Sequence, residues 1–261
     1  MRSKKLQRLR AILKKHRGVL IAFSGGVDST LLLKIAKDVL KDKVIAVTAT
    51  SPLYPETELK VAKEICKLLS VRHFVIHSRE LRDRNFTDNP VNRCYYCKRE
   101  LFSKLKKIAR KKNYTVMEAS NYSDLDDFRP GIRAAKKLGI ESPLIEVKLT
   151  KNEIRKFARK LRLPNWDKPS MACLASRIPY GVKINEIILI RIGRAEGFLK
   201  NLGFSQCRVR DHFPVARIEI LQKDFSRIFR HKTKIIKFLK EIGYKYIALD
   251  LEGYRTGSMN L

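Results

Sequence analysis

The stretch Gly18-Val-Leu-Ile-Ala-Phe-Ser-Gly-Gly-Val-Asp-Ser-Thr-Leu-Leu-Leu-Lys-Ile-Ala36 decides the fold of this chain. Its apolar run over 18–23 predicts a strand, and the pattern from Asp28 onward predicts a helix. Between the two, Ser24-Gly-Gly-Val-Asp-Ser29 brings paired glycines, an acid and hydroxyls to the start of the helix. Backbone N–H groups at such a helix start bind anions, because they lie at the positive end of the helix dipole. The stretch therefore predicts an anion site, with a plain glycine turn as the alternative.

The loop over 24–29 lacks the Gly-Lys-Ser/Thr ending of the Walker P-loop, whose lysine reaches the outer phosphates. It resembles the PP-loop of the ATP pyrophosphatases instead. In that superfamily the loop holds the leaving pyrophosphate while a substrate oxygen attacks the α-phosphorus of ATP, which gives an adenylated intermediate and AMP. The resemblance implies that ATP is bound by Ser24, Gly25, Gly26, Val27, Asp28 and Ser29.

Asp28 is the candidate ligand for Mg²⁺ at this loop, because a carboxylate is a hard oxygen ligand for a hard ion. An acid at a helix start is also an ordinary helix-stabilising choice. The sequence leaves both roles open for this residue.

The length and composition of the chain allow a globular enzyme. With 261 residues and 44% hydrophobic content, there is room for a nucleotide-binding domain and a small second one. The sequence has no run of about eighteen apolar residues, and its basic start does not lead into a signal-peptide core. We therefore expect a cytoplasmic protein with no membrane partner. Five cysteines suit a reducing compartment, in which thiols serve chemistry or metal binding.

The formal net charge of +31 is extreme for a chain of this length. Such a field attracts nucleic acid, phosphates or carboxylated metabolites. The basic residues are spread over nearly every predicted helix, as they also are on ordinary solvated faces. Charge alone therefore does not select among these partners.

Strands and helices alternate over the first 146 residues. The pattern predicts strands at 18–23, 43–48, 73–77, 115–119 and 143–146, with helices at 28–40, 56–69, 97–112 and 131–138. This order indicates an α/β fold with a parallel sheet that is covered on both faces and binds ligands at the carboxyl ends of its strands. Thr48 and Ser51 lie at the end of the second strand, so we expect them beside the anion loop and against the adenine.

The rest of the chain follows a different pattern. Thr150-Lys-Asn-Glu153 is a capping box that opens a helix to about 160, and a proline-rich segment follows at 163–170. Beyond it the pattern predicts a compact α+β unit, with helices at 184–202 and 222–241 and strands at 207–211, 215–220 and 245–250. We therefore divide the chain into a PP-loop domain at 1–162, a cysteine-bearing link at 163–183 and an α+β domain for substrate binding or oligomerisation at 184–261.

Three cysteines form the second chemical signal. Cys94 and Cys97 precede a predicted helix, and Cys173 lies in a loop that folding could bring to the same sheet edge. A 4Fe-4S cluster is usually held by four thiolates, so three would leave one iron open to an exogenous sulfide. Zinc requires a fourth ligand, and no histidine has a suitable spacing. The alternative is that the cysteines are small buried hydrophobes, which suits Cys66 and Cys207.

Arginines supply the remaining candidates. Arg177 could neutralise charge on an adenylate or hold a carboxylate, and it forms the candidate catalytic set with three further residues, Asp28, Cys173 and Ser176. Arg208 and Arg210 are two residues apart, so they project from one face of a strand, where their guanidinium groups suit a compact phosphate together with Arg255. The alternative is that nearby acids pair with these arginines, namely Asp211, Glu219 and Asp250.

Over nearly its whole length the chain resembles the LarE-type sulfurtransferases, the pyridinium-3,5-biscarboxylic acid mononucleotide sulfurtransferases that build the nickel-pincer nucleotide of lactate racemase. The likeness rests on seven separate segments, at 24–29, 92–98, 127–131, 166–181, 208–212, 216–219 and 253–260. The PP-loop alone would indicate only the superfamily. The cysteine loop and the terminal Arg255-Thr-Gly-Ser-Met-Asn260 indicate a much narrower group of proteins than the PP-loop does.

The resemblance implies that ATP adenylates a carboxylate, which sulfur then attacks to give a thiocarboxylate. It also implies a homo-oligomer. Members with only the cysteine equivalent to Cys173 give up its sulfur and end as dehydroalanine, and that sacrificial route stays open here. Cys94 and Cys97 make this chain similar to the subgroup that holds an iron-sulfur cluster and passes on a sulfide.

Two other functions remain open. The first is a PP-loop tRNA thiolase, which would account for the charge and commonly uses a Cys-x-x-Cys pair with a distant third cysteine. This chain has one Cys-x-x-Cys and therefore no terminal zinc ribbons. The second is an ATP-sensing or scaffold protein, which the combination of a complete loop with three candidate cysteines disfavours.

Overall fold

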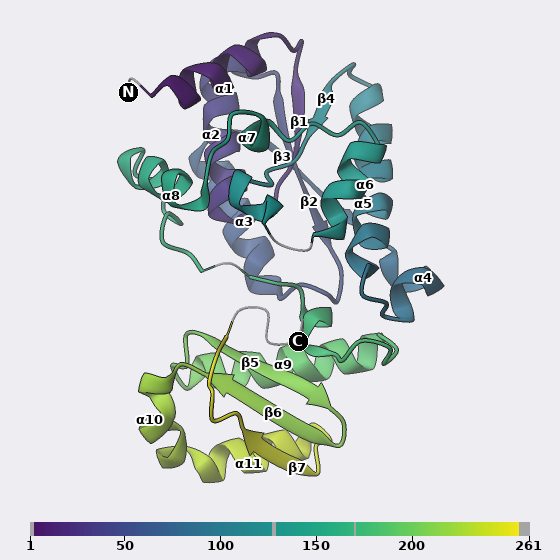
Figure 1. The fold of residues 1–261 in the computed structure, drawn as a ribbon, viewed down its shortest axis with the longest axis vertical. Coiled ribbons are helices and arrows are strands. Elements are labelled where there is room, and N and C mark those ends of the chain that lie inside the picture. Colours follow the sequence, from purple (N-terminus) through teal and green to yellow (C-terminus); the bar gives the residue numbers. More distant parts are fainter. Residues whose placement is uncertain (1–2, 127–128, 170, 256–261) are drawn as a thin grey trace. The chain divides into compact units, whose positions relative to one another are not determined.

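The computed structural model describes residues 3–126, 129–169 and 171–255. They form two compact units (Figure 1). The first comprises Met1–Phe86 and Asn92–Met171, and the second comprises Thr87–Val91 and Ala172–Leu261. The chain thus passes from the first unit to the second within the cysteine-bearing link.

The first unit is built on a parallel sheet of four strands (Figure 1). The strands are β1 (Val19–Ala22), β2 (Val44–Thr50), β3 (Arg72–His77) and β4 (Thr115–Met117), in the order β3-β2-β1-β4. All three strand pairs are parallel. This confirms the predicted α/β fold with a parallel sheet.

Helices cover both faces of this sheet. Successive residues of a strand point to opposite faces, and β1 carries apolar side chains on both of them. Val19 and Ile21 of β1 belong to one apolar core, with α1 (Lys4–Lys14), α2 (Val27–Leu40), α3 (Glu56–Leu68) and α8 (Lys151–Lys160). Leu20 belongs to the other core, with α5 (Arg93–Arg110) and α6 (Pro130–Lys137). The result is a three-layer arrangement that buries Val19, Leu20 and Ile21 of β1 between helices.

The predicted strand at 143–146 is wrong, since this segment forms the short helix α7 (Pro143–Glu146). Only an isolated parallel bridge between Met117 and Glu141 extends the sheet at this point. The reason is Pro143, which has no N–H for a strand ladder and whose fixed φ suits the first position of a helix.

Two predicted helices have other bounds in the structure. The helix expected at 97–112 begins at Arg93, so that Cys94 and Cys97 lie in its first turns rather than before it. The helix expected at 222–241 is divided into η4 (Gln222–Asp224), α10 (Phe225–Arg230) and α11 (Lys232–Glu241). Four further short helices were not expected, namely η1 (Glu80–Arg82), α4 (Arg84–Thr87), η2 (Tyr122–Leu125) and η3 (Leu174–Arg177).

The second unit is an α+β structure, as predicted. Strands β5 (Cys207–His212) and β6 (Val215–Ile220) are antiparallel, and β7 (Tyr246–Leu249) runs parallel to β6. Its apolar core joins one face of β5 and β6 to the helices α9 (Glu186–Asn201), α10 and α11. The other face of these strands therefore carries their polar side chains. No helix in the described ranges is long and apolar enough to cross a membrane.

We expect Leu32→Ala to lower the free energy of unfolding by about 2–5 kcal/mol, because Leu32 is fully buried in the core beneath the anion loop. Urea denaturation followed by circular dichroism measures this change. The matched control is Leu68→Ala on α3, where the side chain is 64% exposed and the loss should stay within about 0.5 kcal/mol. Equal losses in both variants would contradict the core that we describe.

Candidate functional site

The loop between β1 and α2 is held in place by a residue far along the chain. Nδ2 of Asn165 donates to the carbonyl oxygen of Gly25 (2.9 Å) and to Oγ1 of Thr30 (2.9 Å). Gly25 has a φ of +71°, and a Cβ there would lie 3.3 Å from the backbone of Ala62 on α3. The turn therefore requires glycine both for its backbone angle and for its close approach to α3.

The N-terminus of α2 is open to a ligand. Within the described ranges no side chain caps this helix, and Thr30 donates its N–H to the carbonyl oxygen of Gly26 (3.0 Å). The hydroxyl of Ser29 donates to the same oxygen (3.0 Å) and is joined to the hydroxyl of Ser24 (3.2 Å). The hydroxyls thus tighten the loop, while backbone N–H groups at the helix start remain for an anion.

Lys151 is a charged residue at this loop that the sequence analysis did not identify. Its Nζ lies 2.5 Å from Oδ2 of Asp28, and Nδ2 of Asn121 approaches Oδ1 of Asp28 at 3.5 Å. Burial raises the pKa of the Asp28 carboxyl, although the ammonium group of Lys151 acts to lower it. The signal was present, because Lys151 directly follows Thr150, the N-cap of the capping box that the sequence predicted and the structure confirms.

The two residues expected beside the adenine have hydroxyls that are used inside the protein. Thr48 is 7% exposed, and its Oγ1 donates to the carbonyl oxygen of Phe23 (2.8 Å) and lies 2.8 Å from Nε2 of His73. Oγ of Ser51 accepts the N–H of Leu53 (3.2 Å). The Thr48 hydroxyl thus holds the end of β2 and the Ser51 hydroxyl the turn that follows it, so neither is a free hydroxyl.

The five cysteines fall into two groups. None of them forms a disulfide. Cys66 and Cys207 are buried, as predicted, and burial raises the pKa of each thiol to about 12. Cys94 is exposed, while Cys97 and Cys173 are half-buried. Buried thiols with such pKa values are inert at neutral pH, so chemistry is left to the second group.

Cys94 and Cys97 are three residues apart in the first turns of α5, so they lie on the same face of that helix. Cys173 belongs to the second unit, at the N-cap of η3. In the described part of the chain, no three or more His, Cys, Asp or Glu residues are grouped as ready metal ligands.

Arg177 holds the loop that carries Cys173. Its Nη1 donates to the carbonyl oxygens of Ala172 (2.9 Å) and Cys173 (3.1 Å) and to Oγ of Ser176 (2.7 Å). Its Nε and Nη2 donate to the two carboxylate oxygens of Glu196 on α9 (2.8 and 3.0 Å). The fork that was expected to meet a substrate carboxylate is thus occupied by Glu196, which sequence reasoning missed because 19 positions separate the two residues.

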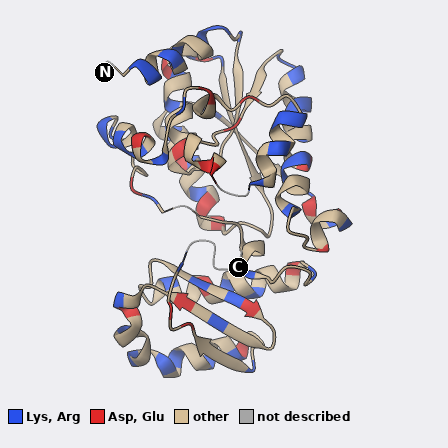
Figure 2. Cartoon of the chain, viewed as in Figure 1, with Lys and Arg blue, Asp and Glu red and all other residues tan. Residues whose placement is uncertain are grey.

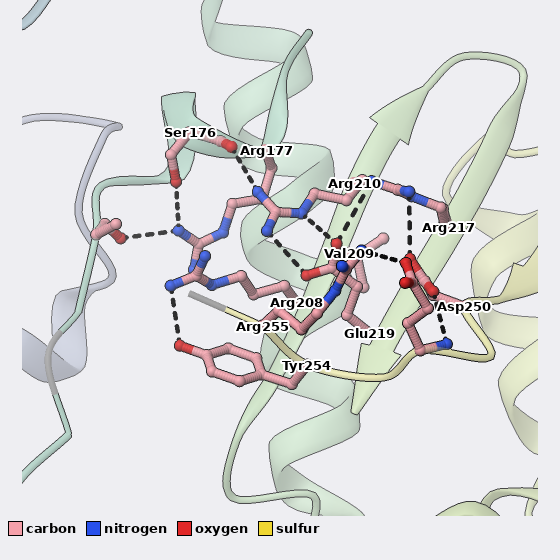
Figure 3. A network of polar contacts seen from close by, with 12 residues as sticks. Ser176, Arg177, Arg208, Val209, Arg210, Arg217, Glu219, Asp250, Tyr254 and Arg255 are labelled. Atoms are coloured by element: carbon pink, nitrogen blue, oxygen red, sulfur yellow. Dashed lines mark hydrogen bonds and ion pairs between the residues drawn. The ribbon is translucent and has the colours of Figure 1, made fainter. Parts of the chain in front are cut away.

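The strand arginines share one face of the second sheet (Figure 3). The register places Arg208 opposite Glu219 and Arg210 opposite Arg217. Arg210 is 1% exposed, and its Nε and Nη2 both donate to Glu219 (2.8 Å each), while its Nη1 donates to the carbonyl oxygen of Ser176 (2.7 Å). The alternative of ion pairing therefore applies to Arg210, and also to Arg217, which lies 3.2 Å from Asp250.

Arg208 has a different environment from Arg210. Its Nη2 donates to the hydroxyl of Tyr254 (2.9 Å), and its guanidinium group lies over the ring of Tyr254 at 4.7 Å (Figure 3). Burial lowers the pKa of Arg208, and the positive charge of Arg177 lowers it further. No acid in the described ranges forms an ion pair with it. This differs from Arg255, which pairs with Glu252.

Parts of three predicted motifs lie outside the described residues. They are 127–128 of the segment 127–131, Ser170 of the cysteine loop, and 256–260 of the terminal motif.

Comparisons with known proteins extend this picture. A PP-loop domain matches residues 1–125. The chain is 35% identical to the pyridinium-3,5-bisthiocarboxylic acid mononucleotide synthase of Lactiplantibacillus plantarum, over 96% of this chain and 91% of that protein. It is also 41% identical to protein slr1717 of Synechocystis, over 100% and 98% of the two chains, and 32% identical to protein MJ0830 of Methanocaldococcus jannaschii, over 97% and 98%.

The chain belongs to the LarE family of PP-loop proteins. The similarity to the synthase covers both units, so it includes the loop of Cys173 and the arginine face as well as the anion loop. Family membership supports an ATP-dependent enzyme of sulfur transfer, and the PP-loop domain supports ATP, with Mg²⁺, as the nucleotide ligand.

We expect Glu219→Gln to lower the free energy of unfolding by about 3–5 kcal/mol, because the variant leaves the buried charge of Arg210 without its partner. The matched control is Glu252→Gln, which breaks an ion pair in which the carboxylate is 64% exposed and should cost less than about 1 kcal/mol. Denaturant unfolding of both variants measures the difference. If the two losses are alike, the Arg210–Glu219 pair does not hold the sheet in the way described.

Proposed function

We propose that this protein uses ATP to adenylate a carboxylate of a pyridinium carboxylate mononucleotide and then converts it to a thiocarboxylate, as a step in the biosynthesis of a nickel-pincer nucleotide. The observation that carries the proposal is the similarity to the synthase along both units, because a likeness confined to the anion loop would indicate ATP use alone. The adenylation and the sulfur transfer then use different residues.

The first half-reaction takes place at the anion loop. A carboxylate oxygen of the substrate bonds to the α-phosphorus of ATP while the bond to the β-phosphate oxygen breaks, and pyrophosphate leaves. The open N–H groups at the start of α2 suit this leaving group. Asp28 offers the hard oxygen ligand that Mg²⁺ prefers, and bound Mg²⁺ would neutralise phosphate charge.

Lys151 supplies what the loop lacks relative to a Walker P-loop. Its ammonium group already lies at the loop, where Asp28 is its counterion. When Mg²⁺ and ATP bring their own charges, Asp28 can turn to the metal and Lys151 to the phosphates, because each then has a partner of opposite charge. We therefore assign Lys151 to phosphate binding in the adenylation step.

The second half-reaction needs sulfur. Sulfide attacks the carbonyl carbon of the adenylate, AMP leaves with the oxygen that joined it to the acyl group, and a thiocarboxylate remains. Cys94, Cys97 and Cys173 are the three cysteines that are not deeply buried, and their thiolates are the donors that a 4Fe-4S cluster requires. Such a cluster would supply an iron without a protein thiolate as the carrier of sulfide. Arg177 and Ser176 act as positioning residues, since their hydrogen bonds hold the backbone of Cys173.

Arg208 is the best candidate on the arginine face for the phosphate of the mononucleotide. Its one described hydrogen bond uses Nη2, so further N–H groups of its guanidinium remain for a ligand. Arg210 lies on the same strand as Arg208, and Arg255 lies on the C-terminal tail. Both add positive charge near Arg208, while their guanidinium groups bind Glu219 and Glu252, respectively.

We expect the purified protein to convert ATP to AMP and pyrophosphate when the carboxylated pyridinium mononucleotide is added, because the loop binds a leaving pyrophosphate. Product analysis by chromatography and pyrophosphate exchange into ATP measure the reaction. Asp28→Asn and Lys151→Gln should each lower the exchange rate by tenfold or more, and Lys151→Arg should restore part of it. ADP and phosphate as stoichiometric products, or exchange that responds to tRNA instead of the mononucleotide, would overturn the proposal.

The control for Lys151→Gln is Lys156→Gln, which removes an exposed lysine from the same helix. This variant should retain the exchange rate of the wild type. If it loses as much as Lys151→Gln, the effect belongs to the general charge of α8 and the assignment of Lys151 fails.

We expect protein prepared without oxygen to bind about four irons per chain, and expect a Cys→Ser change at position 94, 97 or 173 to abolish that binding. Cys66→Ser and Cys207→Ser are the controls and should keep the iron, because these thiols are buried and their pKa is raised to about 12. Iron analysis and absorption spectra measure the cluster. Colourless protein that transfers one sulfur per chain, while Cys173 loses the mass of hydrogen sulfide, would establish the sacrificial route instead.

A further inference from the structure

A small cavity of about 250 Å³, open to solvent, lies in the first unit, apart from the candidate site residues described above. It is lined by Arg17, Lys43, Lys112 and Tyr114. Three cations and a phenol thus form the entire lining, and no carboxylate contributes to it. The cavity is smaller than the pockets of about 300–1,000 Å³ that hold drug-sized ligands, so it suits a compact group.

The topology of the sheet brings these residues together. Arg17 precedes β1, Lys43 precedes β2, and Lys112 and Tyr114 precede β4. These strands are neighbours in the sheet, and Val19 of β1 is in register with Val44 of β2 and Thr115 of β4. The residues before three adjacent parallel strands therefore meet at one edge of the sheet.

Backbone hydrogen bonds hold this edge in place. Val19 donates its N–H to the carbonyl oxygen of Lys43 (2.9 Å), and Thr115 donates its N–H to the carbonyl oxygen of Gly18 (3.0 Å). A Cβ at position 18 would lie only 2.4 Å from the ring of Tyr114, so the ring packs directly on the backbone of Gly18. The pairing of the strands therefore fixes the backbone positions of the residues that line the cavity.

The charge of this cavity is not balanced by the protein. In the ranges that the structure describes, no hydrogen bond or ion pair engages the side chains of Arg17, Lys43 or Lys112. Figure 2 shows Lys and Arg on most helices of the first unit, so positive charge alone does not distinguish this place. Arg17, Lys43 and Lys112 are exposed as well, but strand register holds them around one open cavity, where a bound anion would offset their mutual repulsion.

We propose that this cavity binds a compact phosphate ligand, a phosphate or diphosphate group, at a site separate from the ATP loop. The separation follows from the parallel sheet, because the cavity lies at the amino ends of the strands and the ATP loop follows the carboxyl end of β1. The guanidinium of Arg17 offers a planar fork, the two ammonium groups offer point charges, and the hydroxyl of Tyr114 adds a neutral donor. Phosphate oxygens accept from all of these groups.

Calorimetric titration with inorganic pyrophosphate tests the site, because the probe measures binding without any turnover. The double variant Lys43→Gln/Lys112→Gln should bind one pyrophosphate fewer per chain than the wild type and should keep the rate of ATP cleavage. The matched control is Lys41→Gln/Lys111→Gln, which removes the same charge from equally exposed positions one or two residues away that do not line the cavity. This control should keep the full number of sites.

The count of sites lost does not depend on whether the ATP loop binds pyrophosphate, so failure here is distinguishable from failure of the proposed function. An unchanged count in the Lys43/Lys112 variant overturns the inference, as does an equal loss in the control, which would mean diffuse attraction by surface charge. A further titration uses an oligoribonucleotide. If it binds at the cavity with a dependence on Lys43 and Lys112 while pyrophosphate does not, the cavity belongs to a nucleic-acid backbone and the compact ligand is ruled out.

Discussion

The open N-terminus of α2 is the constraint on which the first unit depends. An anion can bind at the start of this helix only if the first N–H groups are not capped by side chains and the preceding loop is rigid. Asn165 meets both needs, because it bonds to the backbone of Gly25 and the side chain of Thr30 without reaching the N–H groups. It lies 140 positions from Gly25, so the α/β layers must be complete before the loop is held.

Buried arginine–carboxylate pairs have the corresponding role in the second unit. Arg177–Glu196, Arg210–Glu219 and Arg191–Asp211 each join two elements at distances of 2.8 Å. Pairs of this kind add little net stability over apolar residues, but the loss of one partner is costly. Their value here is geometric. Arg210 donates to the carbonyl oxygen of Ser176, so the sheet and the loop of Cys173 move as one piece.

Local patterns predicted most of the fold and less of the site. Alternating apolar runs predicted the parallel sheet, and the capping box at Thr150 predicted the start of α8 to the residue. The prediction of a strand at 143–146 was wrong because this apolar run is too short to distinguish a strand from a helix, and Pro143 favours the helix. Glu196 was missed because its role comes from a tertiary contact with Arg177, and the capping box that locates Lys151 does not reveal its contact with Asp28.

The net charge of the chain did not indicate where the site lies, because the lysines are on the surface while several arginines are buried. Arg177, Arg208 and Arg210 are all at most 6% exposed, whereas no lysine is buried in the described ranges. Several acids are buried as well, among them Glu196, Asp211 and Glu219, which bind arginine. Each of these pairs has no net charge, so burying it leaves the excess of lysine at the surface unchanged. The +31 therefore describes mainly the solvent-facing surface, while the phosphate recognition that we propose for the second unit depends on a few arginines that packing holds in place.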